Sequence, residues 1–305
     1  MPRKTKALLM NLGAILCWAF GPLAIRFLSG YYSALFQSLF RYLSALIVLW
    51  SLTAVFLGPK RLKQEMQSLL ALWPKILLIA LINYGFQLAF ILSLYLLYPG
   101  LVTLVNQSLV LFSVLLAALM FPDERSTLKS ALFLVGMSAA LAGVVMTVVG
   151  SGSFGTARFS VGVLVVLASA LMWALLGGLI RKWLGGVSTF STLSSIFTIV
   201  TVLYLLTYLI ASRGLPIPRA PAGIWAFLVL SGLIGLGVGY SLYYRSVGIL
   251  GLALSSSLTL LIPLLVGIAS FFLFGERLTW VQLSGGLILL CGCYLVIRVR
   301  FHHIE

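Results

Sequence analysis

The stretch Leu12–Gly30, LGAILCWAFGPLAIRFLSG, is echoed 155 residues later by Leu167–Gly185, LASALMWALLGGLIRKWLG. Aligned without gaps, the two stretches share seven identical residues. Among these is a tryptophan followed eight positions later by an arginine, Trp18 and Arg26 in the first copy. A tryptophan and an arginine at the same spacing are harder to match by chance than apolar residues. The sequence therefore predicts an internal duplication.

A second pair of stretches supports the duplication, because Thr103–Thr127 aligns with Ser255–Thr279 at an offset of 152 residues. The identities include Val114, Ala117, Glu124, Arg125 and Thr127, matched with Val266, Ala269, Glu276, Arg277 and Thr279. A loop can absorb the small change of offset. We predict two repeats, residues 1–150 and 151–305, each with five hydrophobic segments. An odd number of spans inverts the second copy in a bilayer, as in many secondary transporters.

The composition is that of a polytopic membrane protein. Of 305 residues, 62% are hydrophobic and 8% are charged, and the mean hydropathy is +1.16. Segments of about 20 apolar residues can cross a bilayer as helices. The predicted fold is an all-α integral membrane protein with ten spans: 7–29, 33–56, 74–97, 101–121, 127–149, 160–183, 188–211, 223–247, 252–274 and 279–298.

The net charge of +15 predicts an orientation in the membrane and not nucleic-acid binding, because the basic residues stand at segment ends. With a cytoplasmic amino terminus, one side carries fourteen of them: Arg3, Lys4, Lys6, Lys60, Arg61, Lys63, Lys75, Arg125, Lys129, Arg181, Lys182, Arg245, Arg298 and Arg300. The other side carries five: Arg26, Arg158, Arg213, Arg219 and Arg277. The positive-inside rule then favours two cytoplasmic termini in the cell inner (plasma) membrane.

Catalytic groups are missing from the predicted spans. All five acids, Glu65, Asp123, Glu124, Glu276 and Glu305, fall in loops or at span ends, and both histidines are in the carboxyl-terminal tail. This argues against a membrane-embedded hydrolase or metalloenzyme and against a proton relay. We predict no catalytic residue, metal or cofactor. Cys17, Cys291 and Cys293 lie in apolar segments and are expected to be small core residues.

Polar side chains within the spans are the candidate substrate contacts. Asn83 and Gln87 are four residues apart and share a helix face, and Asn106 and Gln107 follow in the next span. Small or apolar residues take most of the matching positions in the second repeat. This asymmetry favours a ligand-binding role for the amides, although interhelical hydrogen bonding is an equal alternative.

Arg41 lies inside the second span, one helical turn after Gln37. A charge at that depth marks a functional interior, and the alternative is an arginine that reaches back to the membrane surface. Aromatic residues complete the candidate substrate site, since they can form apolar walls or cation–π faces. They are Trp18, Tyr84, Trp173, Tyr240 and Tyr244. For Tyr240 and Tyr244 an interfacial aromatic belt is the alternative.

The sequence resembles the drug/metabolite transporter superfamily, specifically its ten-helix EamA-type exporters. The resemblance covers nearly the whole chain and rests on Trp18, Phe40-Arg41, Pro263, the run Gly275-Glu276-Arg277-Leu278-Thr279, and Gly285 with Gly292. It implies a central cavity between two five-helix halves, alternating access, and export of amino acids or other small metabolites.

Together these observations predict a secondary transporter, monomeric in the lipid bilayer, that exports a small polar metabolite such as an amino acid. Without an acid in a span, we expect facilitated or exchange-type transport. A channel would require a ring of like polar groups around a pore, and the amides and tyrosines cluster unevenly. Two alternatives remain open: a transporter of an anionic, phosphorylated or carboxylate metabolite, and a proton-coupled exporter of cationic drugs.

Overall fold

The computed structural model describes residues 3–122, 130–152, 154–184, 186–212 and 217–302, and over these residues it is helical without strands. The first predicted repeat contains α1 (Arg3–Leu28), α2 (Ala34–Ala71), α3 (Trp73–Leu96), α4 (Pro99–Asn106), α5 (Leu109–Met120) and α6 (Ala131–Val149). The second contains α7 (Ala157–Leu184), α8 (Thr189–Ser212), α9 (Ala222–Gly232), the π-helix η2 (Leu233–Val238), α10 (Gly239–Thr259), α11 (Ile262–Phe274) and α12 (Trp280–His302).

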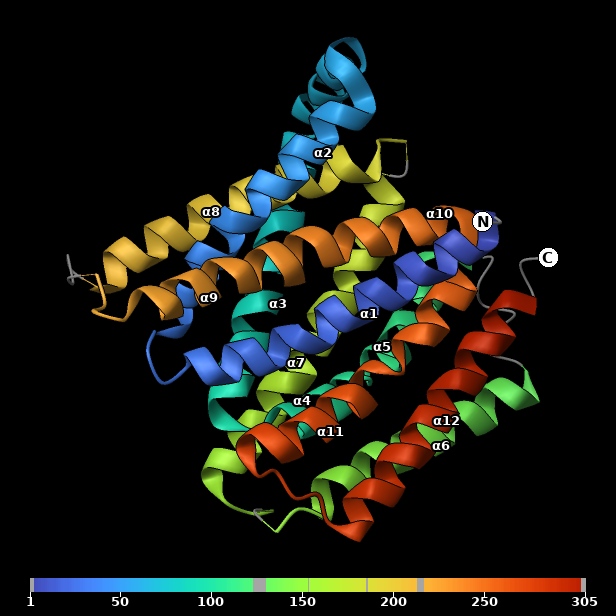
Figure 1. Ribbon diagram of the computed structural model, residues 1–305. Coiled ribbons are helices and arrows are strands. Elements are labelled where there is room, and N and C mark those ends of the chain that lie inside the picture. The colour runs from blue at the N-terminus through green and yellow to red at the C-terminus, as the bar shows by residue number, and fades with distance from the viewer. Residues whose placement is uncertain (1–2, 123–129, 153, 185, 213–216, 303–305) are drawn as a thin grey trace.

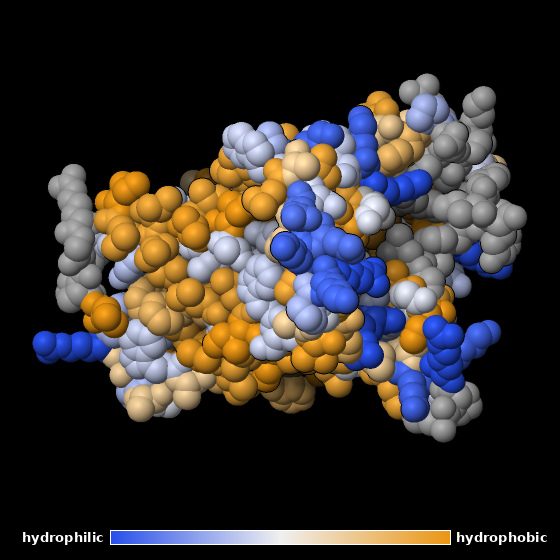
Figure 2. Space-filling view, turned by 90° about the horizontal axis from the view of Figure 1, so that it is seen from above, coloured by the Kyte–Doolittle hydropathy of each residue, from blue (hydrophilic) through white to orange (hydrophobic). Residues whose placement is uncertain are grey.

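Nine helical segments in the described ranges are long and apolar enough to cross a membrane, and α11 is a shorter apolar helix. Large hydrophobic side chains such as Ile47, Val55 and Leu119 are at least 66% exposed, as expected of surfaces that face lipid. Figure 2 shows hydrophobic residues over much of the visible face, with most of the hydrophilic residues between its middle and one end. The predicted all-α, multi-pass membrane fold is confirmed.

Several predicted boundaries differ from the structure, and one proline explains two of the differences. The fourth span begins at Pro99, because a residue before proline avoids helical angles, and Tyr98 is extended (φ −77°, ψ 150°). The span is also broken into α4 and α5 at Gln107 and Ser108. In the second half Gly251 takes the position that matches Pro99, so α10 continues through residues 248–251, which the sequence placed in a loop.

The second span ends in a sharp turn at Gly58, whose φ of 68° is readily adopted only by glycine. The chain then continues as a short basic helix that projects at the top of Figure 1. From this helix, Glu65 accepts hydrogen bonds from Arg61 (3.1 Å) and from Ser191 on α8. Burial alone would raise the pKa of Glu65, but hydrogen bonds from Ser191, Ser188 and Arg61 bring it below its ordinary value.

Helices of the two predicted repeats pack against one another throughout the molecule. α1 packs along α10, α3 along α7, α2 along α8, and α6 along α12 (Figure 1). The first helix of each repeat thus packs on the third span of the other, as a two-fold relation between repeats requires. The boundary at residues 150 and 151 stays a prediction.

The cysteines differ in their surroundings. Cys293 is buried and Cys17 is half-buried, as expected of core residues, whereas Cys291 is exposed on the outer face of α12. The expectation of a core position is therefore wrong for Cys291, because neighbouring helix positions point to different faces.

Candidate functional site

The aromatic residues selected from the sequence belong to one cluster that draws on both repeats. The Trp18 ring lies 5.3 Å from the ring of Tyr240, and Tyr240 lies 6.1 Å from Trp173 and 6.4 Å from Tyr244. Tyr84 joins the same hydrophobic core. Tyr240 is only 5% exposed. An interfacial belt does not fit Tyr240, because it packs inside the helical body, whereas for the half-buried Tyr244 the alternative stays open.

Two tyrosines that sequence reasoning missed connect Tyr84 to the rest of the cluster. Tyr204 on α8 lies 4.6 Å from Tyr84 and 5.5 Å from Tyr42 on α2, measured between ring centroids. The sequence could have indicated Tyr42, because it directly follows Arg41 in the chain. Tyr204 lies in an apolar segment without other polar candidates nearby, so the sequence offered no reason to select it.

Arg41 is buried at this cluster, with 5% of its surface exposed. Among the residues that the structure describes, no hydrogen bond or ion pair reaches its side chain, and Nε is buried without a partner. Its electrostatic neighbours are four tyrosines: Tyr42, Tyr95, Tyr204 and Tyr240. Arg41 therefore does not extend to the membrane surface.

Of the four predicted amides, two lie at the cluster. Asn83 is 2% exposed and accepts a hydrogen bond from the Tyr42 hydroxyl (2.7 Å). Gln87, one turn along α3, lies beside the Tyr240 hydroxyl. Both amides thus link α3 to aromatic residues of neighbouring helices.

The other two amides lie elsewhere. Asn106 accepts a hydrogen bond from Ser169 on α7 (3.3 Å), and the Gln107 carbonyl faces the Cys293 sulfur on α12 at 3.7 Å. Both residues occupy the break between α4 and α5. Among the described residues, these contacts join the two amides to α7 and α12, and none joins them to Arg41, so the structure does not bring all four predicted amides into contact with one group.

Small residues let the helix backbones approach one another around Arg41. The backbone of Gly232 lies so close to α2 that an added Cβ would meet the side chain of Ser44 and stand 2.6 Å from the Arg41 Cα. The following six residues form η2, and such π-helical turns occur frequently at functional sites. Gly239, which follows η2, also lies close to a neighbouring helix, because an added Cβ would stand 3.0 Å from the Trp18 ring.

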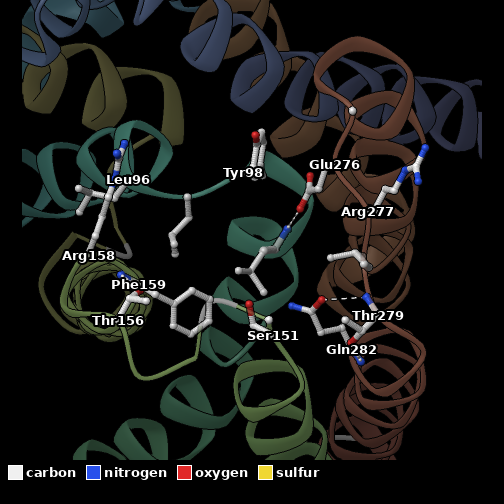
Figure 3. A pocket seen from close by; sticks show the side chains of 15 residues that line it. Leu96, Tyr98, Ser151, Thr156, Arg158, Phe159, Glu276, Arg277, Thr279 and Gln282 are labelled. Atoms are coloured by element: carbon white, nitrogen blue, oxygen red, sulfur yellow. Dashed lines mark hydrogen bonds between the residues drawn. The ribbon is translucent and has the colours of Figure 1, made fainter.

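A separate pocket of about 370 Å³ lies at the other end of α4 (Figure 3). Glu276, 6% exposed, accepts hydrogen bonds from the backbone N–H groups of Gly100 and Leu101, both at 2.8 Å. Arg158 and Arg277 lie on opposite sides of the pocket. The carboxylate thus satisfies the free amides at the amino terminus of α4.

The motif Gly275–Thr279 has a structural explanation. Gly275 ends α11 in a left-handed conformation (φ 66°), as glycine commonly does at helix ends. Thr279 and Gln282 form reciprocal hydrogen bonds at the start of α12, a capping box. Glu276, through the amides of α4, and Thr279, at the start of α12, thus each fix a helix end. The equivalent residues 124–127 of the first half lie outside the described residues.

The sequence profile of the EamA-like transporter family matches residues 5–149 and again residues 160–298. The chain therefore belongs to the EamA-like transporter family. The two matches agree with the duplication inferred from the sequence.

The individual proteins that this chain resembles share low sequence identity with it. An "Uncharacterized transporter" of Haemophilus influenzae (strain ATCC 51907 / DSM 11121 / KW20 / Rd) is 24% identical over 187 residues, which span 61% of this chain and 62% of the relative. A solved structure described as "Crystal structure of protein" superposes with a TM-score of 0.66 at 19% identity, covering 96% of this chain and 97% of the other. The second likeness shows the shared fold.

Proposed function

We propose that this protein is a secondary transporter that exports a small polar metabolite, such as an amino acid, by alternating access. The observation that carries the proposal is the cluster of Trp18, Tyr84, Trp173 and Tyr240, which draws residues from both repeats around a buried cation. Alternating access moves one repeat against the other about a fixed site, so a site shared by both repeats suits that mechanism.

The chemistry of the cluster favours an uncharged or zwitterionic solute. Asn83 and Gln87 carry amides that both donate and accept hydrogen bonds, and the aromatic rings provide apolar walls. Arg41 adds one positive charge without a neighbouring acid. A solute whose own charges balance can therefore meet each of these groups.

A second candidate is an anionic metabolite, which Arg41 favours. A phosphorylated compound carries nearly two negative charges and generally binds several cationic groups. Only Arg41 supplies a buried guanidinium within the described part of the cluster. The single negative charge of a carboxylate therefore matches the single positive charge of Arg41 better than the charge of a phosphate does.

Counterflow measures the proposed transport directly. Vesicles containing the purified protein and an unlabelled amino acid should take up the same labelled amino acid with saturable kinetics, and a protonophore should not abolish the uptake. Protein-free vesicles are the control. Uptake of sugar phosphates alone would establish the rival substrate class. Solute-dependent proton movement that persists in a Glu124→Gln/Glu276→Gln double variant would overturn the facilitated mechanism.

The proposed location is the cell inner (plasma) membrane, with both termini in the cytoplasm and the chain acting as a monomer. The amino end of α1 and the carboxyl end of α12 lie at the same end of the molecule (Figure 1). In a variant without native cysteines, we expect a cysteine at position 60 and one at position 158 to react with a membrane-impermeant reagent from opposite sides. Labelling of both positions from one side would refute this orientation.

A further inference from the structure

Two buried hydrogen-bond donors at the aromatic cluster have no partner. They are Nε of Arg41 and Nε1 of Trp18. Leaving a buried donor unpaired is unfavourable, and more so when the group is charged. Such groups are rare in folded proteins and call for a specific explanation. The two donors come from different helices, α2 and α1, and both require an acceptor that the described residues do not provide.

The Arg41 guanidinium and the Trp18 indole, which carry these donors, both lie beside glycines of the same helical run. A Cβ added to Gly235 would stand 3.5 Å from Nη2 of Arg41, and one added to Gly239 would stand 3.0 Å from Nε1 of Trp18. Residues four apart lie on one helix face, so the two donors are neighbours along that face. Gly21 on α1 also borders the guanidinium, since an added Cβ would stand 3.7 Å from Nη2. Glycines of α1 and η2 thus lie beside the charged group.

An unpaired acceptor lies one helical turn from Arg41. Gln37 is fully buried, and its Oε1 has no partner. Its Nε2 donates to the Tyr95 hydroxyl (2.6 Å) and to the carbonyl of Ile25 (3.3 Å), which holds the amide in place. The region therefore combines two unpaired donors, one of them cationic, with one fixed and unpaired acceptor.

We propose that Arg41 and Trp18 bind the carboxylate of a zwitterionic substrate and that Gln37 Oε1 accepts a hydrogen bond from its amino group. This inference rests on the proposed transport function and assigns the substrate's headgroup to a particular site. A guanidinium and a carboxylate have matching planar geometry. The ammonium group meets an acceptor and nearby aromatic faces. The carboxylate pairs with the buried positive charge of Arg41, and because the substrate's own two charges cancel, binding leaves the net charge of the site unchanged.

Binding to the purified full-length protein tests the headgroup site. The twenty standard L-amino acids are first compared by thermal shift, and the strongest binder is measured by calorimetry beside its decarboxylated amine and its deaminated acid. We expect each analogue to bind at least about tenfold more weakly, the loss of one good polar contact. Equal binding of the amine would overturn the proposal, as would the absence of any stabilising amino acid.

Variants separate ligand binding from a structural role. In Arg41→Gln, the Kd of the amino acid should rise about tenfold or more, and the amine should bind as well as the amino acid does. Because the change removes an unpaired buried charge, the melting temperature without ligand should stay constant or rise. A structural arginine would instead give a lower melting temperature and an unchanged Kd. Arg245→Gln, an exposed arginine of α10, is the matched control.

Two milder variants keep the proposal testable should Arg41→Gln fold poorly. Trp18→Phe retains an aromatic ring but removes Nε1, and it should weaken binding of both carboxylate-bearing ligands. Gln37→Met keeps the side chain's length and should reduce discrimination between the amino acid and its deaminated acid. Wild-type affinities in both variants would overturn the headgroup site. Amino-acid counterflow with wild-type kinetics in all three variants would overturn it while leaving the transport function intact.

Discussion

Gly143→Leu is expected to prevent the protein from reaching a stable folded state. Gly143 lies where α6 and α12 approach backbone to backbone, and an added Cβ would contact the backbone nitrogen of Leu289 and stand 2.6 Å from the carbonyl oxygen of Gly285. Overpacking by a few atoms typically costs about 1–3 kcal/mol. A leucine adds four carbons against backbone that cannot rotate away, so the helices must separate.

Gly177→Leu provides a matched control for this result. Gly177 is an exposed glycine in the interior of α7, and no atom lies within 4 Å of an added Cβ. Leucine has the higher helix propensity by about 0.6–0.8 kcal/mol, so this variant should be as stable as the wild type or slightly more stable. Size-exclusion profiles and melting temperatures in detergent compare the two. Similar profiles and melting temperatures for both variants would show that close packing of α6 and α12 is not required.

The spans could be predicted from the sequence, but the helix contacts could not. Hydropathy and the matched stretches identify α6 and α12 as the fifth and tenth spans. The sequence of neither span indicates that Gly143 contacts Gly285, because any small-residue face can pack on any other. Local backbone chemistry also explains where the helix boundaries of the two halves differ. Pro99 ends the connection before α4, and its absence from the second half lets α10 continue.

The candidate site was also partly predictable. The depth of Arg41 follows from its place in the second span, and the structure shows its side chain buried. Asn106 and Gln107 have the right chemistry but occupy the break between α4 and α5, and the direction of side chains at a break is not encoded by a regular helical period. Gln37 shares a helix face with Arg41, and its significance appears only because its oxygen has no partner.

Glu276→Ala is expected to lower the free energy of unfolding by about 2–4 kcal/mol, because two hydrogen bonds to a charged group are lost and the amides remain buried. The carboxylate comes from the turn between α11 and α12, and the amides of Gly100 and Leu101 belong to α4. The contact therefore joins the two predicted repeats. Arg277→Gln, an exposed neighbour in the same turn, is the control and should leave stability within about 0.5 kcal/mol of the wild type.

Gly100→Ala should produce a similar loss by a different route. An added Cβ at Gly100 would stand 2.7 Å from Oε2 of Glu276 and 3.0 Å from Oε1, so the methyl group displaces the carboxylate without removing it. If both substitutions act on this one contact, the Gly100→Ala/Glu276→Ala double variant should be little less stable than either single variant. The coupling energy should then approach the loss of one single variant, about 2–3 kcal/mol, in the upper part of the range for residues in direct contact. Additive losses in the double-mutant cycle would mean that Glu276 stabilises the protein through something other than the amino terminus of α4.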